Sequence, residues 1–215
     1  MLKTFDLGYS YPKQKTLNFP DLHIEKGENW LILGGSGTGK TTFLHLLGGI
    51  LRPSQGEIYL HGTRIDQLSN AQLDHFRGQN IGIVFQKPYF ATALTVEENL
   101  LLAQKLAGFK PDKSRVSHLL ESLRIVGKKN RYPEQLSVGE QQRASIARAL
   151  VNHPPLILAD EPTSALDDSN CEQVIHLLEN EANHSGASLV IVTHDNRLKN
   201  KFEKRIELEY ESVDH

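Results

Sequence analysis

A glycine-rich turn between an apolar strand and a helix carries residues that could bind phosphate groups. The strand ends at Leu33, and the turn consists of Gly34, Gly35, Ser36, Gly37, Thr38, Gly39, Lys40, Thr41 and Thr42. Glycines at 34, 37 and 39 allow positive φ, so successive backbone N–H groups can point at phosphate oxygens. Lys40 adds a positive charge, and the Thr41 hydroxyl is placed to bind Mg²⁺. The complete G-x-x-x-x-G-K-T pattern predicts a phosphate loop at the start of a helix from Thr41 to about Leu51.

Two acidic residues follow a second apolar strand, Leu156–Ala159. Asp160 suits a carboxylate that holds hydrated Mg²⁺ between the β- and γ-phosphates of a nucleotide. Glu161 could orient or deprotonate the attacking water, a role worth about 10²–10⁴ in rate. An isolated Asp-Glu pair is more often a solvated strand end. Beside a complete phosphate loop, we expect it to be catalytic.

A third motif, Leu136-Ser137-Val138-Gly139-Glu140-Gln141-Gln142-Arg143, resembles the signature motif of the ATP-binding-cassette (ABC) ATPases. Ser137 and Gly139 open an amphipathic helix, whose N-terminus and serine hydroxyl form a second anion site. Two phosphate-binding ends in one chain suggest a pair of chains that share ATP. We therefore expect Ser137, Gly139 and Glu140 to belong to the nucleotide site. Val138 departs from the glycine of the commonest signature.

The resemblance assigns roles to three further residues and to one segment. Gln86 is similar to the Q-loop glutamine, which senses Mg²⁺ and the attacking water, and His194 to the switch histidine that contacts the γ-phosphate. The segment 164–167 resembles the D-loop that crosses to the partner chain. Tyr11 resembles the aromatic residue that stacks on adenine, with Tyr9 as a competing candidate.

Alternating strands and helices must position these residues. Apolar strands at 30–33, 81–85, 156–159 and 188–192 alternate with helices, which favours a mostly parallel sheet with its chemistry at the carboxyl ends of the strands. Loose alternation of apolar residues over 2–24 predicts short half-buried strands, and 87–153 is expected to be all-helical. Ser69 and Thr95 are expected to cap helices.

The fold that the resemblance implies is α/β, a RecA-like P-loop NTPase core with an antiparallel β lobe and an inserted α-helical lobe. This fold would cover the whole chain, residues 1–215, as one domain. Residues 1–86 and 154–215 would form the ATP-binding core with the β lobe, and residues 87–153 the helical lobe with the signature motif.

The composition argues against a nucleic-acid partner and favours a reducing compartment. The formal net charge of −2 over 215 residues provides no basic field, so we expect no nucleic-acid partner. The single cysteine, Cys171, excludes an internal disulfide and suits a reducing compartment. No apolar secretion signal and no run of about 18 apolar residues is present, so a cytoplasmic chain is expected.

The expected function is ATP hydrolysis by two chains, most simply a homodimer, that sandwich two Mg²⁺-ATP and drive a separate transmembrane permease. Such a chain would be peripheral on the inner face of the membrane, with Lys87-Pro88-Tyr89-Phe90 as the candidate docking surface. The alternative is a regulatory or mechanotransmitting ABC ATPase that signals through a membrane partner without moving cargo. The motifs look most like the subgroup that serves lipoprotein release, macrolide export and cell division.

Overall fold

A five-stranded parallel sheet forms the centre of the computed structural model, which describes residues 1–12, 16–163 and 168–209. The strand order is β10-β4-β9-β8-β7, and each neighbouring pair is parallel. The strands are β4 (Asn29–Gly34), β7 (Ile81–Val84), β8 (Leu156–Asp160), β9 (Ser188–Thr193) and β10 (Lys204–Leu208). The predicted parallel sheet is confirmed.

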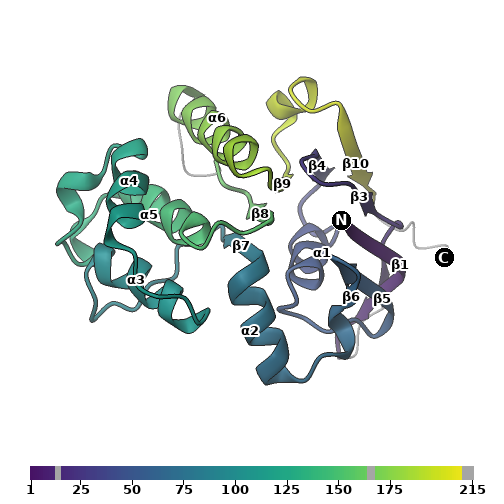
Figure 1. The fold of residues 1–215 in the computed structure, drawn as a ribbon. Coiled ribbons are helices and arrows are strands. Elements are labelled where there is room, and N and C mark those ends of the chain that lie inside the picture. The colour runs from purple at the N-terminus through teal and green to yellow at the C-terminus, as the bar shows by residue number, and fades with distance from the viewer. Residues whose placement is uncertain (13–15, 164–167, 210–215) are drawn as a thin grey trace.

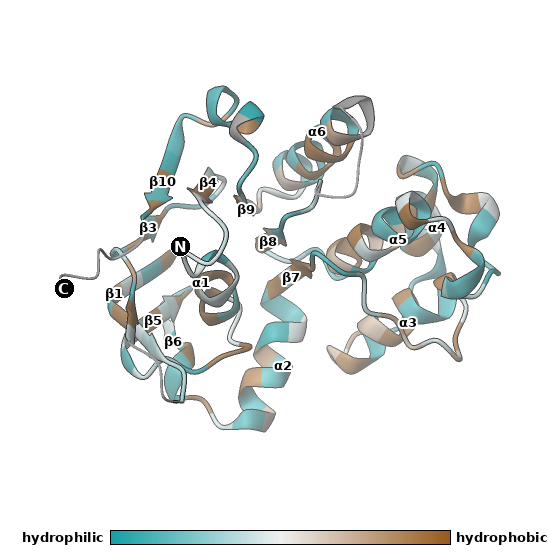
Figure 2. Ribbon diagram, turned by 180° about the vertical axis from the view of Figure 1, so that it is seen from behind, coloured by the Kyte–Doolittle hydropathy of each residue, from teal (hydrophilic) through white to brown (hydrophobic). Residues whose placement is uncertain are grey.

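Both faces of this sheet are buried, as continuous apolar strands require. Along β4, Leu31 and Leu33 belong to one hydrophobic cluster, whereas Ile32 between them belongs to the other. The first cluster also contains residues of the helical lobe and of the helix α6 (Asp168–Ser185), and the second contains residues of α1 and of the antiparallel sheet. Figure 2 shows the hydrophobic residues gathered on β7, β8 and β9.

The predicted β lobe is an antiparallel sheet in the order β2-β1-β5-β6, with β3 also paired to β1. Its strands are β1 (Leu2–Ser10), β2 (Thr16–Asn18), β3 (His23–Ile24), β5 (Gln55–Leu60) and β6 (Thr63–Arg64). It lies on the opposite side of the molecule from the helices α3 to α5 (Figure 1).

The helix after the phosphate loop, α1 (Lys40–Leu47), is shorter than predicted. Gly48 caps it, and Gly49 then takes a φ of 62°, so the chain leaves the helix four residues before Leu51. The apolar residues after position 47 extended the helical pattern beyond the real end. A short 3₁₀ helix, η1 (Ile65–Gln67), precedes α2 (Asn70–Asn80), which Ser69 caps as predicted.

The segment 87–153 contains α3 (Val96–Leu106), α4 (Lys113–Ser122), α5 (Val138–Leu150) and the 3₁₀ helices η2 (Val126–Lys128) and η3 (Pro133–Gln135). Its predicted helical character is confirmed, as is the helix cap at Thr95, which forms a capping box with Glu98. Among the helices that the structure describes, none is both long and apolar enough to cross a membrane.

The edge strand β10 was not predicted from the sequence. It follows the 3₁₀ helix η4 (Asn196–Asn200) and pairs with β4. Its residues are largely hydrophilic in Figure 2 and mostly exposed, so no buried apolar run marks it. Glu28 links β10 to β4, because its carboxylate accepts hydrogen bonds from Lys204 on β10 and from the indole of Trp30 on β4.

Candidate functional site

The phosphate loop joins β4 to α1 at the carboxyl edge of the parallel sheet. Gly37 and Gly39 have φ of 85° and 90°, as predicted. Gly34 does not take a positive φ, which corrects the prediction for that residue. Glycine is needed there for space, since a Cβ would lie 2.5 Å from Thr38 Oγ1 and 2.8 Å from the carbonyl oxygen of Leu208.

Lys40 lies folded over the loop. Its Nζ donates a hydrogen bond to the carbonyl oxygen of Gly35 at 2.8 Å and lies 4.0 Å from Glu161 Oε1. The Thr38 hydroxyl donates to the same carbonyl at 3.0 Å. A nearly buried ammonium at the N-terminus of a helix favours the binding of an anion such as phosphate.

Thr41 and Asp160 meet at the edge of the sheet. The Thr41 hydroxyl donates to Asp160 Oδ1 at 3.3 Å, and both residues line a cavity that Gln86 also lines. Burial of the Asp160 carboxyl raises its pKa, a cost that a bound cation would offset. A carboxylate, a hydroxyl and an amide oxygen are hard ligands of the kind that Mg²⁺ prefers.

Glu161 follows Asp160 in a left-handed conformation, with φ of 46°. Its backbone N–H donates to the carbonyl oxygen of Val192 on β9, and its buried side chain turns toward the end of that strand. Glu161 Oε2 accepts a hydrogen bond from the Thr193 hydroxyl at 2.8 Å. Oε1 lies 3.0 Å from the backbone nitrogen of His194 and 2.7 Å from His194 Nδ1.

Sequence reasoning missed two residues of this region. Thr193 ends β9 beside His194, and only its place at a parallel strand end could have marked it. His45 lies four residues after Thr41 on α1, hence on the same helix face, and lines the cavity with Asp160. Burial lowers the pKa of the His45 imidazole, while the Asp160 charge opposes this effect.

The signature motif begins α5 in the helical lobe. Ser137 caps the helix, and Glu140 completes a capping box with it. The exposed side chain of Val138, with 62% of its surface accessible, follows directly. Residues of α5 pack in the cluster on one face of the parallel sheet and those of α1 in the cluster on the other face.

Tyr11 is held against the phosphate loop, because its hydroxyl lies 2.9 Å from Thr42 Oγ1. The ring of Tyr9 packs edge-on against it, with the centroids 4.8 Å apart. Of the two tyrosines, Tyr11 is thus bonded to the loop itself. The predicted D-loop, residues 164–167, lies outside the described residues.

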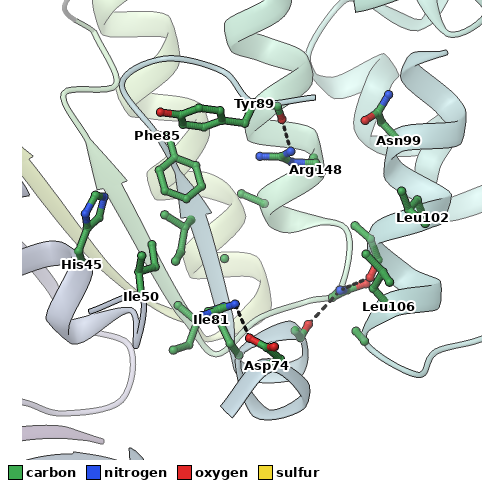
Figure 3. Close-up of a pocket in the computed structure, with 18 of the residues that line it drawn as sticks. His45, Ile50, Asp74, Ile81, Phe85, Tyr89, Asn99, Leu102, Leu106 and Arg148 are labelled. Atoms are coloured by element: carbon green, nitrogen blue, oxygen red, sulfur yellow. Dashed lines mark hydrogen bonds and ion pairs between the residues drawn. The ribbon is translucent and has the colours of Figure 1, made fainter. Parts of the chain in front are cut away.

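An open groove of about 1130 Å³ runs from Thr41 and Asp160 to the helical lobe. Figure 3 shows Ile50, Ile81, Phe85, Leu102 and Leu106 along it, with Tyr89 at one end. The exposed fraction of Tyr89 is 62%. Phe90, by contrast, is half-buried against the helical core under the Arg148 guanidinium, so Tyr89 is the exposed aromatic of the candidate docking segment 87–90.

Comparison with known proteins decides the family. The ABC transporter family model matches residues 17–164. The chain belongs to the ABC transporter ATPases. It is 40% identical to the lipoprotein-releasing system ATP-binding protein LolD of Colwellia psychrerythraea, over 90% of this chain and 76% of that protein. It is also 40% identical to LolD of Treponema denticola, over 88% of this chain and 86% of that protein.

Solved structures of ABC cassettes share the fold. A dimer of the cassette MJ0796 bound to ADP and Pi, in a post-hydrolysis state, matches with a TM-score of 0.90 and 33% identity over 99% of this chain and 97% of that chain. CbiO1 of Clostridium perfringens, part of the ABC transporter complex cbiONQ, matches with a TM-score of 0.78 and 32% identity over 90% of this chain and 78% of that chain. This ABC protein is therefore an ATP-binding and ATP-hydrolysing transporter subunit.

Proposed function

We propose that two copies of this chain form a homodimer around two Mg²⁺-ATP and drive a separate membrane permease. Each nucleotide lies between the phosphate loop of one chain and the Ser137–Gly139 helix start of the other. The observation that carries the proposal is the meeting of the phosphate loop, Gln86, Asp160 and His194 at one edge of the sheet. The signature helix start is exposed elsewhere on the chain, available to a partner.

Within this site the loop residues 34–42 bind the phosphates, and Thr41, Gln86 and Asp160 hold Mg²⁺. The metal supplies charge neutralisation of the β- and γ-phosphates. The donor set fits it, since Asp160 is buried and lies within 3.3 Å of the Thr41 hydroxyl. Lys40 balances the remaining phosphate charge.

Glu161 is the catalytic carboxylate and His194 the group that reaches the γ-phosphate. Their contact of 2.7 Å supports a joint role, in which His194 holds the carboxylate that positions the attacking water. Tyr11 stacks on adenine, and its hydroxyl bond to Thr42 holds the ring at the mouth of the loop. This chain contributes three residues to the nucleotide site of its partner, namely Ser137, Gly139 and Glu140.

The permease docks in the groove beside Tyr89. The groove is largely apolar, and it reaches the Mg²⁺ residues at its other end, so an occupant could act on the nucleotide site. We place the protein at the cytoplasmic face of the membrane through this partner, as one domain with the core at 1–86 and 154–215 and the helical lobe at 87–153. The name of its LolD relatives supports lipoprotein release as the process.

ATP-dependent dimerisation of the Glu161→Gln variant tests the sandwich. The variant keeps every phosphate-binding group but lacks the base, so it should trap the ATP-bound state. Size-exclusion chromatography with light scattering should show a monomer without nucleotide and a dimer with Mg²⁺-ATP, while ADP gives a monomer. A variant that binds ATP and stays monomeric would contradict the proposal.

A further inference from the structure

A carboxylate lies at the start of the signature helix. Glu140 Oε2 accepts a hydrogen bond from the Ser137 backbone N–H at 2.9 Å, and the Glu140 N–H donates to Ser137 Oγ at 3.3 Å. This capping box fixes the serine, yet it adds a negative charge to the first helical turn. The hydrogen bond from Ser137 and the Lys128 ammonium lower the pKa of Glu140, so the group is ionised at neutral pH.

The negative charge of Glu140 opposes the proposed binding of the partner's γ-phosphate at the start of this helix. A helix N-terminus attracts anions through its free N–H groups and its dipole. A neighbouring carboxylate repels a γ-phosphate brought to the same place, and this repulsion would weaken closure of the dimer. The Glu140 side chain is 24% exposed, so water and salt screen part of this repulsion.

Lys128 lies where it can cancel this charge. Its Nζ is 3.1 Å from Glu140 Oε1, the oxygen that does not bond Ser137. Its loop is fixed to the first turn of α3, because the carbonyl oxygens of Lys129 and Arg131 each accept a backbone hydrogen bond from that turn at 2.9 Å. The backbone next to Lys128 is therefore fixed to the helical lobe, while the Lys128 side chain itself is 44% exposed.

We propose that Lys128 is a positioning residue for the shared ATP site, where it neutralises and orients the Glu140 carboxylate so that the Ser137 helix start can accept the partner's γ-phosphate. This inference rests on the proposed function. The two charges form one unit: Glu140 holds Ser137, and Lys128 makes that arrangement compatible with an incoming anion.

Loss of Lys128 should weaken the ATP-bound dimer. An exposed ion pair of this kind changes an equilibrium by about threefold, and a homodimer contains two such sites, so the dimer dissociation constant should rise about tenfold. Added salt should shrink the difference, because it screens the repulsion.

Sedimentation of the Glu161→Gln variant with Mg²⁺-ATP measures the dimer dissociation constant. Lys128→Ala should raise it about tenfold and Lys128→Arg should restore it, while Lys129→Ala, the matched control, should stay within about twofold. In a Glu140→Gln background the cap survives without its charge, and Lys128→Ala should then have no effect. ATP affinity of the monomer should stay unchanged throughout, and the urea midpoint should fall only by the small amount expected for the loss of an exposed ion pair.

The outcomes separate this inference from the proposed function. If the Glu161→Gln parent does not dimerise with ATP, the sandwich itself fails. If the parent dimerises and Lys128→Ala behaves as Lys129→Ala does, Lys128 has no such role. An equal loss in the Glu140→Gln background, or a fall in the urea midpoint that accounts for the weakening, would also overturn the inference.

Discussion

Glu161 is held by the Thr193 hydroxyl at the end of β9 and by the backbone and ring nitrogens of His194. The Thr193 hydroxyl, which also accepts a hydrogen bond from the Asp195 backbone N–H, can be removed by an isosteric substitution. We predict that Thr193→Val lowers kcat about tenfold, since a hydrogen bond to a charged group is worth about 1.5–3 kcal/mol. KM for ATP should not change, because Thr193 is not in the phosphate loop. Steady-state ATPase assays check this, with Thr193→Ser as the control that keeps the hydroxyl. An unchanged kcat in Thr193→Val would contradict the role.

Glu28 gives a prediction on stability and pH. The Lys204 ammonium and the Trp30 indole lower the pKa of its carboxyl to about 2 from the ordinary value of 4.5. The charged form is therefore favoured in the folded state, and this stabilisation is present above pH 4.5 and lost as pH falls toward 2. Glu28→Gln should lose about 1 kcal/mol at pH 7 and progressively less below pH 4.5.

Urea unfolding at pH 7, 4 and 3 measures this change. Glu121→Gln, at an exposed position on the helical lobe, is the control and should match the parent at each pH. A loss in Glu28→Gln that is the same at every pH would show that the carboxylate charge is not the cause.

Single residues were the most predictable part of the site. The phosphate loop, Asp160, Glu161 and His194 could be placed because their types and spacing leave few alternatives. Thr193 and Lys128 could not, because each acts through a neighbour that is close only in space. The prediction of a positive φ at Gly34 was wrong. Glycine is needed there because Thr38 and Leu208 come too close for a Cβ, and only the folded chain brings these residues together.

At the scale of elements, a capping box stabilises the start of α3 in the helical lobe. Thr95 and Glu98 exchange hydrogen bonds at the start of α3, with the Thr95 N–H 2.8 Å from Glu98 Oε2. Thr95→Ala should lower the free energy of unfolding by about 1 kcal/mol, while Thr95→Ser should keep most of it. Urea midpoints compare the two, and equal losses would show that methyl packing, not the cap, matters.

Elements with a buried face could be predicted, and the others could not. The strands β7, β8 and β9 and the capped helices α2, α3 and α5 carry local signals. The exposed edge strand β10 has none, since it depends on pairing with β4 and on the contact of Lys204 with Glu28. The sequence pattern overestimated the length of α1, because the apolar residues after Leu47 make their contacts outside the helix.

At the scale of the whole molecule, the groove predicts how the permease is engaged. Tyr89→Ala should reduce co-purification with the permease and its stimulation of ATPase activity, because the exposed Tyr89 ring lines one end of the groove. Basal ATPase activity should persist. Phe109→Ala, an exposed aromatic that does not line the groove, is the control. Normal co-purification and stimulation in Tyr89→Ala would rule out docking there.

The central claim is that each ATP site is built from two chains, and mixing two inactive variants tests it most directly. Lys40→Ala removes the phosphate-loop charge. Gly139→Asp adds a carboxylate to the signature helix at a position where a Cβ meets no atom within 4 Å, so the fold should tolerate it. Each homodimer then has two broken sites, whereas a mixed dimer has one intact site.

The mixture should recover about a quarter of wild-type ATPase activity, since half of randomly paired symmetric dimers are mixed and each has one of two sites intact. Either variant alone should remain inactive at the same total concentration. Recovery on mixing would show that the phosphate loop and signature helix of one site belong to different chains. A mixture no more active than its components would contradict the shared site.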